Sequence, residues 1–109
     1  MNLGRVCASI VLVLGGAPWT GCQSNLSLAP PISPSFIRAG ARENADERTL
    51  SQGRVLFLNR CIQCHALPEI ARFDAPRLTA ILAKMSDRAS LSPKEHEAVL
   101  KYLLTARSL

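Results

Sequence analysis

The sequence lacks the local patterns of several common functional classes. It contains no internal repeat, no glycine-rich phosphate loop and no serine nucleophile elbow, so nothing in it predicts a repeat protein, a nucleotide-binding loop or a serine hydrolase. Its 13 Lys and Arg residues form no basic block, and we therefore expect no nucleic-acid partner. No run alternates with period two over the length of a strand, which favours an all-α fold.

Acidic residues are absent from the first 22 positions, where Arg5 precedes an apolar run over residues 6–17. This pattern predicts a secretory signal, since the run is too short to span a membrane as a helix. The segment ends in four residues that resemble the bacterial lipobox, namely Trp19, Thr20, Gly21 and Cys22. Three of them match, whereas Trp19 stands where the motif usually has Leu. The resemblance implies a signal peptide over residues 1–21, a lipid on Cys22, and a protein exported to the bacterial periplasm and anchored to a membrane. A soluble exported protein, an uncleaved anchor and an unpaired Cys22 thiol are the alternatives.

The most informative motif is Cys-x-x-Cys-His at Cys61, Cys64 and His65, which is typical of covalent attachment of a c-type haem. The two thiols lie about one helical turn apart, so each can form a thioether to one porphyrin. His65 follows the second thiol directly and can present an imidazole nitrogen to the iron as the proximal ligand. The motif predicts one haem c.

Two other interpretations of the cysteine pair deserve comparison. A zinc site needs further ligands, and the remaining candidates are Cys7, Cys22 and His96, of which the first two fall in the targeting segment. A thioredoxin-like dithiol or a structural disulfide would suit a strand before Cys61, whereas the preceding residues favour a helix. Both are weaker than the haem hypothesis, which export also supports.

Residues 22–45 are rich in Pro and Ser and show no sustained apolar period. They predict a tether, whose Pro- and Ser-rich stretch from Gln23 to about Ala41 reaches up to about 60 Å when extended at roughly 3 Å per residue. Some apolar residues in this segment could wrap onto the folded domain like a strand, and we assign them no function: Leu26, Leu28, Ile32, Phe36 and Ile37. Residues 46–109 then form one domain, too small to bury a large core, so we expect a bound haem to complete its interior.

Three helices are predicted in residues 46–109. The first begins near Thr49, where Thr49 and Gln52 fit a capping box, and it carries a buried stripe of Leu50, Gly53, Phe57 and Cys61. The second begins near Pro76 and presents one apolar face of Leu78, Ile81, Leu82 and Met85. The third begins at the capping box of Ser92 and Glu95, runs to Arg107, and buries Val99, Tyr102, Leu103 and Ala106.

Residues 49–109 resemble a small monohaem cytochrome c domain. The resemblance is carried by Gly53 and Phe57 in the first helix, Cys61, Cys64 and His65, a Met about twenty residues later, and Tyr102 with Leu103 in the last helix. It implies that the first and last helices cross at Gly53. It also implies that a proline carbonyl, from Pro76 or else Pro68, accepts a hydrogen bond from His65.

The sixth iron ligand would decide the function. Met85 is the expected ligand, because cytochromes c prefer His/Met pairs. Core filling by Met85, ligation by His96 and an open iron that binds gases or peroxide remain alternatives.

A haem with both axial positions filled predicts a one-electron carrier rather than an enzyme, with no small-molecule substrate. Its partners would be redox proteins: an oxidase, a quinol-oxidising complex or a dehydrogenase. Without Arg5, twelve basic residues remain against eight acidic ones, and these charges could steer docking onto an acidic partner. A haem subunit of a larger oxidoreductase is the alternative function.

Overall fold

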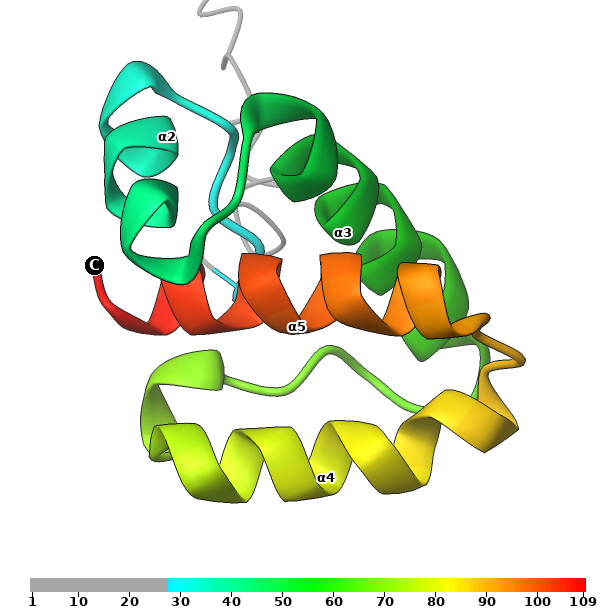
Figure 1. Ribbon diagram of the computed structural model, residues 1–109. Coiled ribbons are helices and arrows are strands. Elements are labelled where there is room, and N and C mark those ends of the chain that lie inside the picture. The colour runs from blue at the N-terminus through cyan, green and yellow to red at the C-terminus, as the bar shows by residue number, and fades with distance from the viewer. Residues whose placement is uncertain (1–27) are drawn as a thin grey trace, which may run out of the picture.

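The computed structural model describes residues 28–109, and the regular structure in this part of the chain is helical (Figure 1). Residues 28–109 contain the four α-helices α2 (Pro34–Gly40), α3 (Glu47–Arg60), α4 (Ala75–Arg88) and α5 (Pro93–Arg107). Three short 3₁₀ helices complete it: η1 (Ala41–Glu43), η2 (Cys61–Gln63) and η3 (Ile70–Arg72). The predicted all-α fold is confirmed, with one α-helix more than expected.

Each long helix begins at a side chain that caps free backbone N–H groups. The Asp46 carboxylate accepts a hydrogen bond of 2.8 Å from the Thr49 N–H, and hydrogen bonding from the side chain and the N–H of Thr49 lowers the pKa of Asp46. The predicted start near Thr49 is therefore wrong by two residues, because Asp46 supplies an earlier cap. Asp74 caps α4 in the same way through the Arg77 N–H at 2.8 Å, with Pro76 in the first turn.

The start of α5 agrees with the sequence. Ser92 Oγ accepts a bond from the Glu95 N–H, while the Glu95 carboxylate accepts one of 2.8 Å from the Ser92 N–H. These bonds lower the pKa of Glu95. The predicted end at Arg107 is confirmed as well.

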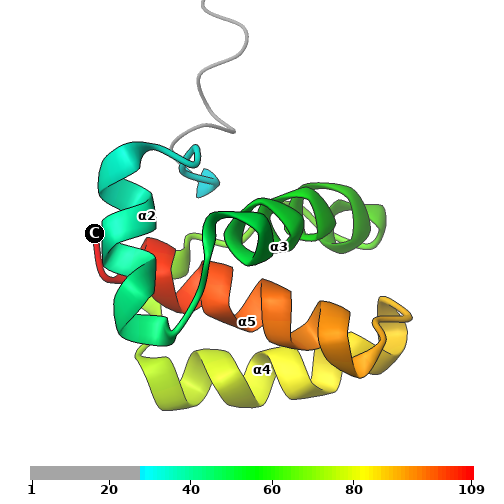
Figure 2. The same cartoon turned by 45° about the horizontal axis from the view of Figure 1, so that its top comes forward.

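Helices α3 and α5 pack together at Gly53, and they lie side by side in both views (Figures 1 and 2). A Cβ atom on Gly53 would collide with the Ala98 carbonyl oxygen and lie 2.7 Å from Tyr102 Cβ. The glycine thus lets the two backbones approach closely, and the crossing implied by the cytochrome c resemblance is present at Gly53 and Tyr102.

Residues 28–45 were expected to form a tether, and this expectation is wrong for the described part of the chain. Residues 34–40 form α2, and Ala29, Phe36 and Ala45 belong to the hydrophobic core. The Phe36 ring stacks on the Tyr102 ring with a centroid separation of 5.3 Å. Burial of these apolar groups explains why the segment folds onto the domain instead of remaining extended.

Hydrogen bonds hold the segment just before α2. The Arg54 guanidinium donates to the carbonyl oxygens of Ala29 and Pro30, at 3.2 Å and 3.0 Å for the shortest bond to each. The Tyr102 hydroxyl also donates to the Pro30 carbonyl, at 2.9 Å. Burial raises the pKa of Tyr102 to about 12. The chain is therefore fixed to the α3–α5 crossing at Ala29 and Pro30.

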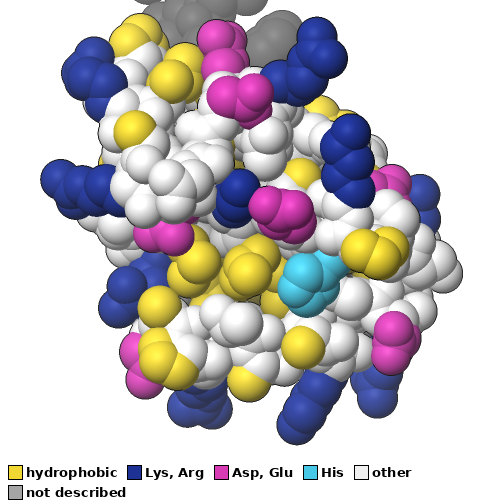
Figure 3. Space-filling model, viewed as in Figure 1, with side chains coloured by type: hydrophobic (Ala, Val, Ile, Leu, Met, Phe, Trp, Pro, Cys, Tyr) yellow, Lys and Arg dark blue, Asp and Glu magenta, His cyan; other side chains and the backbone are white. Residues whose placement is uncertain are grey.

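Helix α4 packs along α5, and the long loop from η2 through η3 connects the end of α3 to the start of α4 (Figure 1). On the face of Figure 1, hydrophobic side chains gather between α5 and α4, while Lys and Arg side chains lie around the edge (Figure 3). Within residues 28–109, none of the helices combines the length and apolar character required to cross a bilayer.

Candidate functional site

The three motif residues lie where α3 ends and the chain turns away from the bundle. Cys61 terminates α3 and opens η2, whereas Cys64 and His65 follow in an exposed turn. Both cysteines are free thiols. Cys61 is half-buried, and this burial raises the pKa of its thiol. The helix end thus presents two thiols and an imidazole within five residues.

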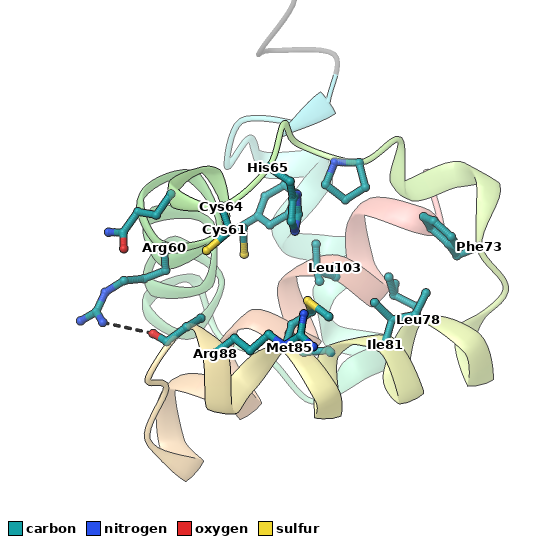
Figure 4. A pocket seen from close by; sticks show the side chains of 15 residues that line it. Arg60, Cys61, Cys64, His65, Phe73, Leu78, Ile81, Met85, Arg88 and Leu103 are labelled. Atoms are coloured by element: carbon teal, nitrogen blue, oxygen red, sulfur yellow. Dashed lines mark hydrogen bonds between the residues drawn. The ribbon is translucent and has the colours of Figure 1, made fainter.

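These residues form one wall of a cavity of about 380 Å³, a size within the range of cofactor pockets. The opposite wall comes from α4 (Figure 4), while α3 and α5 add Phe57 and Leu103 to the lining. The lining residues are Phe57, Arg60, Cys61, Gln63, Cys64, His65, Pro68, Phe73, Leu78, Ile81, Leu82, Met85, Arg88, Ala89 and Leu103. Most of them are apolar, so the cavity suits a large hydrophobic group.

Met85 and His65 lie on facing walls of this cavity (Figure 4). The thioether of Met85 projects from the last turns of α4, and the imidazole of His65 projects from the loop after η2. The sulfur atoms of Cys61 and Cys64 lie at one end of the cavity, between these two side chains. The structure therefore brings together the four residues that the sequence analysis selected.

The hydrogen bond at His65 defines its tautomer. Its Nδ1 atom lies 2.7 Å from the carbonyl oxygen of Ala66. A carbonyl only accepts, so Nδ1 is the donor in this contact, and Nε2 is the ring nitrogen that remains to bind a metal. A neutral imidazole in this state is suited to bind a metal.

The two prolines expected to support His65 differ in position. Pro68 lines the cavity, but Pro76 is exposed in the first turn of α4 and does not. The carbonyl partner of His65 is that of Ala66 rather than of either proline. The assignment of this role to a proline is not supported here, because the local turn after His65 already provides an acceptor.

His96 does not line the cavity. It is half-buried near the start of α5, where its Nδ1 forms a hydrogen bond with Ser86 Oγ. Of the proposed ligands, His65 and Met85 reach the cavity and His96 does not.

Several lining residues were missed by the sequence analysis. Arg88 follows Met85 by three positions on α4, and this helical spacing could have identified it. Arg60 donates to the carbonyl of Ala89 at 3.2 Å, which joins the end of α3 to the turn after α4 (Figure 4). No sequence pattern relates these two residues, because the contact exists only in the folded chain.

Phe73 was also missed, since it lies in a loop without periodicity. Its carbonyl accepts a bond of 2.7 Å from Arg107 Nε. The Arg77 guanidinium lies 5.7 Å from the centre of its ring, in cation–π geometry. These two arginines hold the aromatic wall of the cavity in place.

The zinc-site alternative and the lipid acceptor are the remaining points of the sequence analysis. Among residues 28–109, no group of three or more His, Cys, Asp and Glu side chains is arranged to hold a metal ion directly. The lipid acceptor Cys22 and the signal segment lie outside the described residues.

Comparison with known proteins finds similarity to a cytochrome c-type protein. The relative is TorC of Escherichia coli (strain K12), which is 30% identical over 84 residues. The match covers 77% of this chain and 22% of TorC, so this chain spans about a fifth of the relative's length. No protein-family model matches the sequence. No solved structure matches it either.

Proposed function

We propose that this protein carries one covalently bound haem c and relays single electrons between redox partners. One observation carries the proposal: the imidazole of His65 and the thioether of Met85 face each other across an apolar cavity with two free thiols at one end. The similarity to a cytochrome c-type protein supports the same class.

The residues present fit the group. Cys61 and Cys64 would each add a thiol across a vinyl group of the porphyrin, which leaves the cofactor permanently attached. His65 would ligate the iron through Nε2, while its Nδ1–H donates a hydrogen bond to the Ala66 carbonyl. The bound haem would supply one-electron exchange.

The protein's own side chains would determine how that exchange occurs. Met85 would occupy the sixth position, which excludes substrate from the iron and raises the reduction potential. Phe57, Leu82 and Leu103 would exclude water from the porphyrin faces. With both axial positions filled, the remaining function is that of a carrier rather than an enzyme.

Docking and location complete the proposal. Arg60 lines the cavity beside the thiols and Arg88 lines it on the Met85 side, and both could attract carboxylates of an acidic redox partner (Figure 4). Export to the periplasm and a lipid on Cys22 rest on the sequence of residues 1–22.

Purified mature protein from a host able to attach haem c provides the first test. We expect a reduced α-band, a pyridine haemochrome spectrum typical of two thioethers, and colour that acid-acetone does not extract. The Cys61→Ala/Cys64→Ala variant should lose the covalently bound colour. Full extraction from the wild type would refute covalent haem.

The role of Met85 needs a second test. Oxidised wild type should show a near-infrared charge-transfer band from sulfur to iron, and Met85→Leu should lose it, because Leu keeps the volume without the sulfur. The reduced variant should also bind carbon monoxide rapidly. If the reduced wild type already binds carbon monoxide rapidly and Met85→Leu leaves that rate unchanged, Met85 only fills space and the protein is a haem sensor or peroxidase with an open iron.

Size-exclusion chromatography of a native extract would separate a free carrier from a subunit. A free carrier elutes at its own size. Co-elution with a large complex would instead identify a haem subunit of an oxidoreductase.

A further inference from the structure

Ser86 follows Met85 directly on α4, and its side chain is buried with 8% of its surface exposed. Its hydroxyl donates a hydrogen bond of 2.8 Å to the Leu82 carbonyl one turn earlier. The same oxygen is paired with Nδ1 of His96 on α5. Because the single hydroxyl proton goes to Leu82, the Nδ1 proton of His96 is the one donated to Ser86.

The other end of this contact is also fixed. The His96 N–H donates to the Ser92 carbonyl at 2.8 Å, and Ser92 with Glu95 forms the capping box that starts α5. His96 therefore extends from a helix turn whose position is already set. The Ser86–His96 bond transfers that position to α4.

The backbone around Met85 is tied to the same turn. The Met85 carbonyl accepts a bond of 2.9 Å from the Ala89 N–H, and the Ser86 carbonyl accepts one of 3.0 Å from the Leu91 N–H. Ser90 between them adopts a left-handed conformation with φ of 52°. The peptide that carries Met85 is thus held by the turn, whereas its side chain faces the cavity.

From this arrangement we infer that Ser86 and His96 are positioning residues, which keep the Met85 sulfur directed at the iron site. The inference rests on the proposed function, in which Met85 is an iron ligand. The inference gives His96 a role away from the iron, since His96 does not line the cavity. Without the pair, the last turn of α4 would lose its side-chain hydrogen bond to α5.

The test uses the haem-bearing protein with Ser86→Ala and His96→Ala. Each should weaken the near-infrared sulfur band and lower the reduction potential. Carbon monoxide should displace the thioether about fivefold more readily in the reduced state, the equivalent of one hydrogen bond. His96→Asn should restore these values towards the wild type, because its side-chain amide retains a donor near the Nδ1 position.

Thr105→Val is the matched control. Thr105 is fully buried on α5, donates to the Lys101 carbonyl at 2.8 Å, and does not line the cavity. Thr105→Val removes a bond to the carbonyl one turn earlier, as Ser86→Ala also does, but it breaks no bond between α4 and α5. The variant should therefore lose thermal stability while its sulfur band and carbon monoxide binding stay unchanged.

Two results would overturn the inference. The first is that Ser86→Ala and His96→Ala lower only the unfolding temperature, as Thr105→Val does, and leave the sulfur band and carbon monoxide binding unchanged. Alternatively, Met85→Leu would leave the wild-type spectrum intact, and this outcome refutes the ligand itself. Should Ser86→Ala fail to fold, the comparison of His96→Ala with His96→Asn decides alone.

Discussion

Gly53 lies directly against Tyr102: a Cβ atom on the glycine would be 2.7 Å from Tyr102 Cβ and would overlap the Ala98 carbonyl. This contact defines how closely α3 and α5 approach. Since α3 delivers Cys61 and α5 supplies Leu103, the crossing also sets the distance between two walls of the cavity.

Gly53→Ala should therefore destabilise the protein despite the better helix propensity of Ala. The added Cβ would force the α3 and α5 backbones apart, which should lower the free energy of unfolding by about 1–3 kcal/mol. The better helix propensity of Ala returns only about 1 kcal/mol. Thermal or chemical unfolding of the haem-bearing protein measures the difference.

Gly40→Ala is the control for that change. Gly40 is also buried at a helix position, but its Cβ would meet the flexible end of the Leu50 side chain, 2.5 Å from Cδ1. Leu50 can move where the Ala98 backbone cannot, so Gly40→Ala should cost less. Equal losses in the two variants would contradict this account of the crossing.

Phe36→Ala tests whether residues 28–45 belong to the folded unit. Phe36 is fully buried and stacks on Tyr102, so its truncation should cost about 3–5 kcal/mol in the free energy of unfolding. Ser35→Ala on the same helix changes an exposed residue and should have little effect. A negligible loss for Phe36→Ala would restore the tether hypothesis.

Stability should fall at alkaline pH because of Tyr102. Burial raises the pKa of Tyr102 from 10.0 to about 12, so the folded state favours the neutral phenol. The contribution of Tyr102 to the free energy of unfolding is complete below pH 10 and is lost as the pH rises through about 12. The unfolding midpoint, followed from pH 9 to 12, should drop less steeply in Tyr102→Phe, which has no ionisable hydroxyl. Parallel profiles for the two proteins would argue against the raised pKa.

The capping box of α5 predicts the opposite trend at acidic pH. The bonds from Ser92 lower the pKa of Glu95 from 4.5, so its contribution is present above that value and is lost as the pH falls through the lower folded pKa. Glu95→Gln should remove this part of the acid dependence. Ser92→Ala should cost about 1 kcal/mol at neutral pH, as measured by thermal unfolding.

The sequence predicted those elements whose signals are local. Ser92 and Glu95 identified the start of α5, because both partners of the cap lie within one turn. The start of α3 was misplaced because Asp46, another good cap, lies three residues before Thr49. Local signals of equal strength leave such a boundary ambiguous.

Helix α2 was not predicted, because seven residues are too few for a periodic pattern and three prolines lie just before it or at its start. Its stability comes from Phe36 on Tyr102, a contact between distant parts of the chain. The Ser86–His96 bond was unpredictable for the same reason. Cys61, Cys64 and His65 were selected by one compact motif, whereas Met85 needed helical spacing together with a family resemblance.

The folded domain begins at Ala29 and Pro30, because Arg54 and Tyr102 bind the carbonyls of these residues. This limits the distance between the domain and a lipid anchor at Cys22. Six residues separate Cys22 from Ala29, and a fully stretched chain covers at most about 25 Å between them. If Cys22 carries a lipid, the folded domain would therefore lie within about 25 Å of the lipid anchor, less than half the reach of about 60 Å that the predicted tether would allow. Electrons would then pass to neighbours embedded in, or resting on, the same lipid surface.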